Sequence, residues 1–267
     1  MQGPQSDSVT WRINGERLML LGWGRAILMQ FSHPLVAQAV ADHSSFRDGR
    51  FERLARLRST VQAMLALTFG DRTQVAGAAT HINRIHDRIH GTLATAAGPF
   101  PAGTPYSAHD PELLTWVLAT LMESVPMTYE LLIGPLSRED HERYCVEARG
   151  AGELLGIPEA MIPRNPEEVR AYIQDRIARG DIVVTDLARL LARDILYPPF
   201  QAAYWPLARV LRLTTAGTLD PRLREGYGLA WTDRDARALA RWARGVRAAR
   251  TIAPGLVARW HAARGSR

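Results

Sequence analysis

The sequence predicts an all-α protein folded as a single helical domain. Apolar residues recur along most of the 267 residues at the three-and-four spacing of amphipathic helices, and strands do not alternate with helices. The one run of β-branched residues, 182–184, is too short to found a sheet. A content of 46% apolar and 22% charged residues is typical of a globular protein that buries one sizeable core.

Helix-breaking residues divide the first half of the chain. The pair His33-Pro34 ends the first apolar helix, and Gly70 separates two long amphipathic helices, the second of which Asp71 can cap. The periodic pattern of this second helix continues to about Gly91. We therefore predict helices over residues 18–31, 35–43, 51–69 and 71–91, followed by a loop rich in glycine and proline over 98–110.

The second half begins with a clear helix start, in which Asp110 is followed by proline in the first turn. This helix ends at a turn over 133–135, and Ser137 with Asp140 predicts the cap of the next one. Further breaks occur at 197–199, Gly217, 220–221 and 254–255. The remaining predicted helices cover 137–155, 166–178 and 186–196, with shorter ones after them.

The expected organisation has three parts. We expect residues 1–10 to be disordered, 11–230 to form the helical domain, and 231–267 to form arginine-rich helices packed on it or extending from it. The start of the chain lacks the basic and then apolar layout of a secretory leader. The longest apolar stretch, 18–31, is interrupted by Arg25 and is shorter than the roughly 20 residues of a membrane span. These features predict a cytoplasmic protein without a membrane span.

The basic and sulfur-containing residues exclude several kinds of chemistry. All 33 basic residues are arginine, so Schiff bases, pyridoxal phosphate anchors and lysine-based phosphate loops are excluded. The single cysteine, Cys145, excludes disulfides within the chain, cysteine-ligated zinc ribbons and iron–sulfur clusters. Its neighbours are typical of a helix, so we expect Cys145 to be a small buried hydrophobe.

The net charge of +6 comes largely from the C-terminal part of the chain. Up to residue 200 the arginines are interspersed with nearly as many acids, whereas 234–267 contains nine arginines. This distribution favours a solvated helix face and does not favour nucleic acid as a partner. Peripheral contact of the basic tail with an anionic membrane surface or an acidic partner is the alternative.

A histidine occupies the core-facing seam of the predicted helix over 71–91. The apolar or small residues of this seam are Val75, Ala79, Ile82 and Ile89. His86 completes it, and three interpretations remain open. His86 is a structural histidine, a ligand to haem iron, or a metal ligand together with His90, which follows four residues later.

Three further polar side chains are candidates for a site. Arg56 and Thr60 lie four residues apart on the preceding helix, where they could hold a propionate, polarise bound dioxygen or orient a substrate oxygen. The alternative is a surface arginine and a threonine bonded to its own helix. His43 could move a proton, although its neighbour Asp42 does not face it on a helix.

Six strings in this order resemble the MpaB and rubber-oxygenase catalytic domain, over about Trp11 to Tyr227. They are His33-Pro34-Leu35-Val36, Asp42-His43-Ser44, Arg56 with Thr60, Arg84-Ile85-His86, Tyr106 to Glu112 with Trp116-Val117, and Leu155-Gly156-Ile157-Pro158. The resemblance implies a helical fold with a haem b pocket between core helices. It places the family's proximal histidine at His86 and its paired arginine and threonine at Arg56 and Thr60.

The resemblance also implies an activity. Members of the family are oxygenases that use dioxygen on apolar substrates, including oxidative cleavage of carbon–carbon double bonds. Rubber-cleaving members carry a lysine where this chain has Ser59, and they are exported, so we expect a smaller intracellular lipid or isoprenoid. The expected function is therefore a haem b-dependent oxygenase. The alternatives are a non-catalytic haem-binding protein and a metal-dependent enzyme that uses His86 and His90.

Overall fold

The protein is an all-α single domain with one small two-stranded sheet. A computed structural model describes residues 7–43, 50–197, 201–252 and 259–260, without the side chains of 50–58, 60 and 201–207. The helices of the first half are α1 (Val9–Asn14), η1 (Arg17–Met19), α2 (Leu20–Phe31), α3 (Pro34–His43), α4 (Arg50–Phe69), α5 (Arg72–His86) and α6 (Pro111–Leu132). Those of the second half are α7 (Arg138–Leu154), η3 (Glu159–Met161), α8 (Pro166–Ala178), α9 (Asp186–Leu196), α10 (Gln201–Thr218), α11 (Pro221–Gly226) and α12 (Asp233–Ile252).

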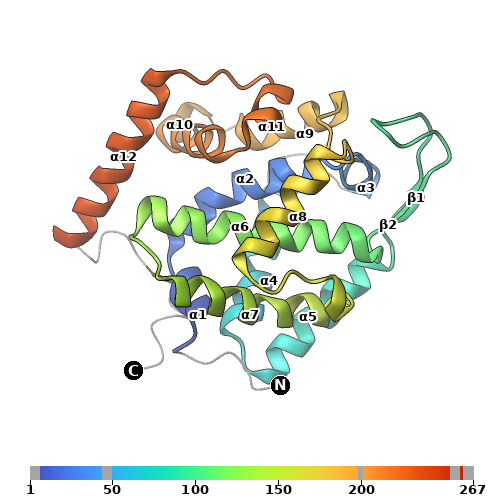
Figure 1. The fold of residues 1–267 in the computed structure, drawn as a ribbon, viewed down its shortest axis with the longest axis horizontal. Coiled ribbons are helices and arrows are strands. Elements are labelled where there is room, and N and C mark those ends of the chain that lie inside the picture. The colour runs from blue at the N-terminus through green and yellow to red at the C-terminus, as the bar shows by residue number, and fades with distance from the viewer. Residues whose placement is uncertain (1–6, 44–49, 198–200, 253–258, 261–267) are drawn as a thin grey trace.

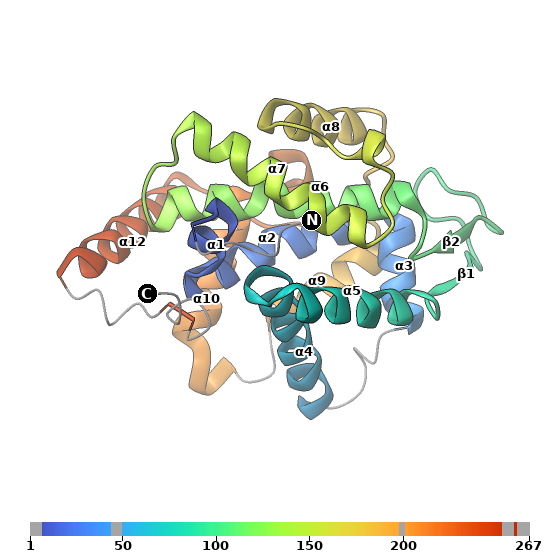
Figure 2. The ribbon, with the colours of Figure 1, turned by 90° about the horizontal axis from the view of Figure 1, so that it is seen from below.

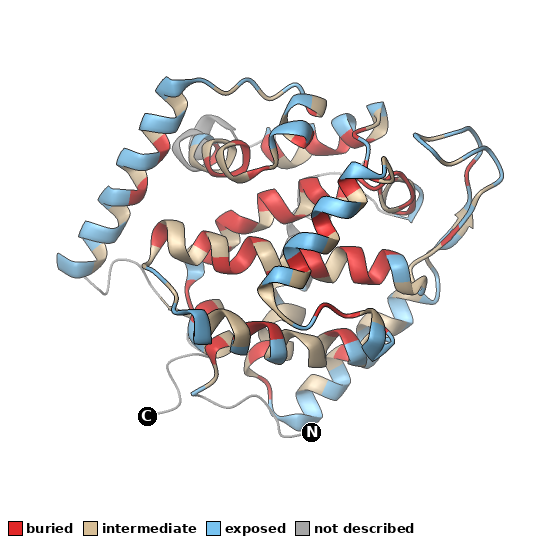
Figure 3. Cartoon of the chain, in the orientation of Figure 1, coloured by how far each residue is buried: buried red, intermediate tan, exposed pale blue. Residues whose placement is uncertain are grey.

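Helices α2 and α6 form the centre of the molecule. In the view of Figure 1, α8 crosses over them, α9, α10 and α11 lie above them, and α4, α5 and α7 lie below. Helix α2 contacts α6, α9 and α10, whereas α8 packs against α6. Figure 3 shows that the buried residues are concentrated on these central helices. The helices around them cover an apolar core that no single helix could bury alone.

The core is held at the C-terminal end of α2 by two aromatic side chains. Trp116 of α6 is fully buried, and its indole N–H donates to the carbonyl of Met29 at 3.1 Å. Tyr227 is also buried, and its hydroxyl donates to the carbonyl of Leu28 at 2.5 Å. Both rings therefore fill the core while satisfying polar atoms that would otherwise be costly to bury.

Arg25, which interrupts the apolar stretch of α2, forms a buried ion pair. It is only 4% exposed, and its guanidinium contacts Glu123 at 2.5 Å and the hydroxyl of Ser124 at 2.6 Å. Its Nε donates to the carbonyl of Thr218 at 2.7 Å. The one side chain thus joins α2, α6 and α10, and its charge is paired, as burial requires.

Most predicted helices are present, and local signals mark their starts. Helices α8 and α9 have the predicted bounds. Ser137 and Asp140 form a reciprocal capping box at the start of α7, and Asp110 caps α6. Helix α1 begins at Val9, inside the segment that we expected to be disordered, and Val9 is buried against a satellite cluster of the core.

A small sheet lies where we predicted a helix end and a loop. Strand β1 (His90–Thr92) pairs antiparallel with β2 (Pro105–Ser107), and Gly91 faces Tyr106 in the register. Figure 1 shows that this hairpin projects beyond α3 and α6 at one end of the molecule. Each strand has only three residues, so the hairpin depends on the helices behind it for stability.

Helix α12 packs along one side of the molecule. It contacts α10 and α6, and its buried residues are Leu239 and Ala243. The arginine-rich segment is therefore packed on the other helices over this length, and a boundary near residue 230 stays a prediction. None of the helices in the described part of the chain combines the length and apolar character that crossing a membrane requires.

Candidate functional site

The predicted site is built on the hairpin of α4 and α5, which pack against each other (Figure 2). Asp71 caps α5 as predicted. Its carboxylate accepts from the backbone N–H of Gln74 at 2.8 Å, and the side chain of Gln74 accepts from the N–H of Asp71 at 2.8 Å. This capping box satisfies two backbone donors and sets where α5 begins.

One face of α5 is turned inward, as the seam predicts. Ala79 is buried, and Val75, Ile82 and His86 are half-buried, whereas most other residues of the helix are exposed. The side-chain amide of Asn83, on the same side, donates to the carbonyl of Leu154 of α7 at 3.2 Å. His86 therefore lies on the inward face, at the last residue of the helix.

The prediction that His86 and His90 share a helix face is wrong. Helix α5 ends at His86, and His90 is exposed and begins β1. The N–H of Ile89 bonds back to the carbonyl of His86 at 2.9 Å, and its own carbonyl accepts from the N–H of Ala108 at 2.8 Å. Pairing with the segment before α6 thus stops the helix one turn earlier than its periodic pattern suggests.

Because His86 and His90 do not share a helix face, the alternative metal site lacks the geometry that it requires. Two histidines bind a metal like a helical zinc site only when both project from the same helix face. Within residues 7–43, 50–197, 201–252 and 259–260, no group of three or more His, Cys, Asp or Glu side chains could hold a metal ion. A metal-dependent enzyme that uses His86 and His90 is therefore not supported.

His86 has an unusual environment for a half-buried imidazole. Its Nδ1 is buried and has no hydrogen-bond partner among the described residues. Burial lowers the pKa of His86, the nearby His109 lowers it further, and Asp87 opposes both effects. The ring is therefore neutral near pH 7 and has a ring nitrogen without a protein partner, which is the state that a metal ligand needs.

His109 is a neighbour that sequence reasoning did not single out. Its ring lies 5.8 Å from that of His86, centroid to centroid, at an interplanar angle of 81°. Its Nε2 is 2.8 Å from a carboxylate oxygen of Asp87. The only signal for it was its place in the string from Tyr106 to Glu112, because its distance along the chain hides its proximity to α5.

His43 belongs to a cluster at the end of α3. Asp42 and His43 do not bond to each other, but both reach Tyr106, whose hydroxyl donates to Asp42 and lies 3.5 Å from Nε2 of His43. The same Nε2 is 3.0 Å from the carbonyl of His90. Burial, and then the bond to Asp42, raise the pKa of Tyr106 to about 12. His43 is thus attached to the strand that follows His86, and its part in proton transfer stays a prediction.

Arg56 and Thr60 lie on α4, but their side chains are outside the described residues. Their proposed roles therefore stay predictions. In the part of α4 whose side chains are described, Val61 and Met64 are half-buried and Thr68 is buried.

Cys145 has the inert environment that the sequence predicts. Its side chain is buried in the main core, and burial raises the pKa of its thiol to about 11. A thiol with a raised pKa carries little thiolate near pH 7, so it is a poor nucleophile and a poor ligand.

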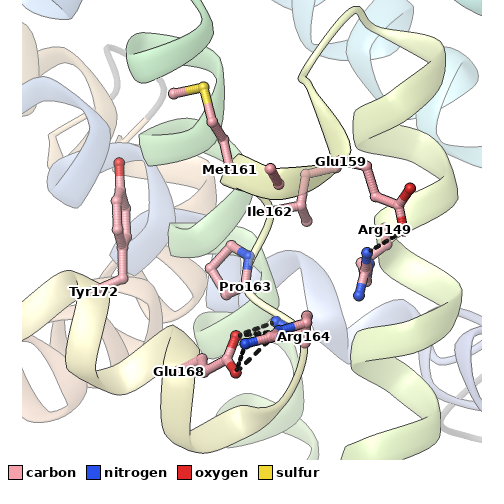
Figure 4. A pocket seen from close by; sticks show the side chains of 9 residues that line it. Arg149, Glu159, Met161, Ile162, Pro163, Arg164, Glu168 and Tyr172 are labelled. Atoms are coloured by element: carbon pink, nitrogen blue, oxygen red, sulfur yellow. Dashed lines mark hydrogen bonds and ion pairs between the residues drawn. The ribbon is translucent and has the colours of Figure 1, made fainter.

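Two surface pockets lie away from these residues. The first, of about 560 Å³, is bordered by the ion pairs Arg149–Glu159 and Arg164–Glu168, with Tyr172 on the opposite side (Figure 4). The second, of about 550 Å³, lies between α9 and the segment after α11. Neither is lined by a predicted site residue. The arginines of the first pocket are therefore paired with carboxylates of the same pocket.

Comparison with known proteins finds a family model and two relatives that match the chain. A family model described as "ER-bound oxygenase mpaB/B'/Rubber oxygenase, catalytic domain" matches residues 11–248. Uncharacterized proteins of Mycobacterium tuberculosis and of Mycobacterium bovis are each 26% identical to the chain over 222 residues, which is 79% of this chain and 80% of theirs. No solved structure matches the chain.

Proposed function

The chain belongs to the family of mpaB and rubber-oxygenase catalytic domains, and on this basis we propose that it is a haem b-dependent oxygenase. Its substrate would be a small apolar lipid or isoprenoid, attacked with dioxygen at an alkene carbon or an activated C–H bond. We also propose that it acts in the cytoplasm. The family description supports oxygenase chemistry, and the haem, the substrate and the location are our inference.

The unpaired Nδ1 of His86 is the observation that carries the haem assignment. A buried polar atom without a partner costs roughly 1–3 kcal/mol, a cost that a ligand bound to this nitrogen would offset. Neutral imidazole is the usual protein ligand to haem iron, and the lowered pKa of His86 keeps the ring neutral. When bound, haem would supply a site at which dioxygen is activated.

The remaining residues would shape the site and exclude water. We propose that the inward face of α5, with Ala79 and Ile82, forms an apolar wall of the site. We assign Arg56 and Thr60 to polarising dioxygen or to holding a propionate. We expect His43 to hold β1 in place by donating from Nε2 to the carbonyl of His90, which leaves Nδ1 as the ring nitrogen that could accept a proton.

An absorption spectrum of protein produced with added haem tests this proposal. We expect wild type and His90→Ala to show a Soret band and about one haem per chain, and His86→Ala to lose both. His90→Ala is the matched control because the side chain of His90 is exposed and only its backbone carbonyl is used. Full haem retention in His86→Ala, or a colourless wild-type protein, would show the assignment to be wrong.

Oxygen consumption then separates an oxygenase from a haem carrier. Haem-loaded wild type should consume dioxygen when supplied with an unsaturated lipid or isoprenoid, and Thr60→Ala should consume it more slowly while keeping its Soret band. A loaded protein that consumes no oxygen with any such substrate would favour the non-catalytic haem-binding alternative.

A further inference from the structure

The outward face of α12 carries a row of exposed arginines. These residues are Arg234, Arg237, Arg241 and Arg244. Their spacing of three and four residues places them on one face of the helix. The opposite face carries Leu239 and Ala243, which are buried against the rest of the protein, so the arginine face is turned to solvent. Figure 1 shows α12 along the edge of the molecule, with no other helix outside it.

These arginines differ from those of α7 and α8. There, exposed arginines pair with a carboxylate one turn away, as in Arg138–Glu142 at 2.8 Å and Arg179–Asp175 at 2.9 Å. Residues 236–252 contain five arginines and no acidic residue. In the described part of the chain, Arg237, Arg241 and Arg244 have no carboxylate partner within 4.0 Å. Their charge is therefore available to an anionic partner.

An exposed isoleucine lies in line with the arginines. Ile252, the last residue of α12, is 84% exposed. It follows Arg234 by eighteen residues, which is five full helical turns, so both lie on the same face. A surface with guanidinium groups and an exposed aliphatic side chain fits a lipid headgroup region, which offers phosphates with acyl chains beneath them. A nucleic acid backbone offers phosphates without such an apolar layer.

We propose that this face of α12 docks on the surface of an anionic phospholipid bilayer. The guanidinium groups of Arg237, Arg241 and Arg244 bind headgroup phosphates, for which their planar, permanently charged donors are suited. Ile252 enters the boundary between headgroups and acyl chains. None of these residues belongs to the proposed haem site, so the surface can be tested whether or not the protein holds haem.

Flotation with vesicles tests the proposal directly. Full-length protein is mixed with vesicles of phosphatidylcholine alone, or of phosphatidylcholine with about one-third phosphatidylglycerol, at low and at high salt. We expect binding to the anionic vesicles only, weakened by salt. Each basic residue near an anionic surface raises partitioning by about five-fold, so the triple variant Arg237→Gln, Arg241→Gln, Arg244→Gln should bind about 100-fold less.

A matched control variant distinguishes the effect of this face on vesicle binding from the effect of net charge. Arg164→Gln, Arg170→Gln, Arg179→Gln removes the same charge from exposed residues that pair with carboxylates around α8. It should bind anionic vesicles within a few-fold of wild type. Ile252→Ser keeps every arginine and should reduce binding several-fold. Circular dichroism confirms that each variant is folded.

Three outcomes would overturn the proposal. The first is equal binding to neutral and anionic vesicles, or binding to neither. The second is an equal loss in the two triple variants, which would leave net charge as the explanation. The third is tighter binding to a short DNA duplex at the same salt, measured by fluorescence anisotropy, with no effect of Ile252→Ser.

Discussion

At the scale of single residues, His33 shows how one side chain can cap a helix and fill the core. It is 1% exposed, and its Nδ1 accepts from the backbone N–H of Leu35 at 3.3 Å, in the position of an N-cap before Pro34. Its ring stacks on Phe100 with centroids 5.4 Å apart. The capping bond needs an unprotonated ring nitrogen, so the fold requires this histidine to be neutral.

This requirement predicts a loss of stability in acid. Burial, and then the charge of Arg176, lower the pKa of His33 to about 4. Between this value and the usual pKa of about 6.5, the unfolded chain binds a proton that the folded chain does not. The stability contributed by neutral His33 is therefore complete above about pH 6.5 and is lost as the pH falls toward 4, by an amount on the order of 3 kcal/mol. Urea unfolding at several pH values measures it.

His33→Asn provides the control for this effect. Asparagine keeps an acceptor for the N–H of Leu35 but does not titrate, so the variant loses ring packing at every pH. Its free energy of unfolding should depend less steeply on pH between about 6.5 and 4 than that of wild type. An unchanged slope would mean that other groups, and not His33, set the acid sensitivity.

At the scale of elements, the junction between α5 and the hairpin positions His86. A Cβ added to Gly91 would lie 2.5 Å from the hydroxyl and 2.7 Å from Cζ of Tyr106, the ring that bonds to Asp42. Only a residue without a side chain fits beside this ring. The junction therefore couples the end of α5 to α3, and a substitution at Gly91 should disturb both helices.

Two glycine substitutions should have opposite effects on stability. Gly91→Ala forces Tyr106 aside and should lower the free energy of unfolding by about 1–3 kcal/mol. Gly77 is an exposed residue in the middle of α5, and an added Cβ would meet nothing within 4 Å. Gly77→Ala should raise the free energy of unfolding by about 0.5–1 kcal/mol. Chemical denaturation of both variants tests this, and destabilisation by Gly77→Ala would contradict the geometry of α5.

The same junction shows what the sequence could and could not predict. The starts of α5, α6 and α7 follow from capping residues within one turn, so local patterns were sufficient. The end of α5 does not, because its apolar spacing continues to Ile89 and pairing with Pro105–Ser107 ends the helix. The inward face that carries His86 follows from local spacing and was predictable. The approach of His109 and Tyr106 to this junction depends on contacts between segments distant in the sequence, and it was not.

At the scale of the whole molecule, the two ends of the described chain meet. The N–H of Trp260 donates to the carbonyl of Gly15 at 3.0 Å, and the guanidinium of Arg17 lies 4.8 Å above the ring of Trp260. Glu16, which lies between Gly15 and Arg17 in the sequence, is only 4% exposed. Its carboxylate pairs with Arg250 and lies 3.5 Å from Arg259. Arg250 thus has a structural role, unlike the exposed arginines of α12.

A double-mutant cycle on Glu16 and Arg250 should show that this ion pair holds the ends together. Arg250→Met leaves a buried carboxylate with only the more distant Arg259, and should cost about 2–3 kcal/mol of unfolding free energy. Glu16→Gln removes the charge, so adding Arg250→Met to it should cost at least 1 kcal/mol less than in wild type. Urea unfolding of the four proteins gives this coupling. Strictly additive effects would mean that the contact is incidental and that the packing of Trp260 and α12 holds the ends.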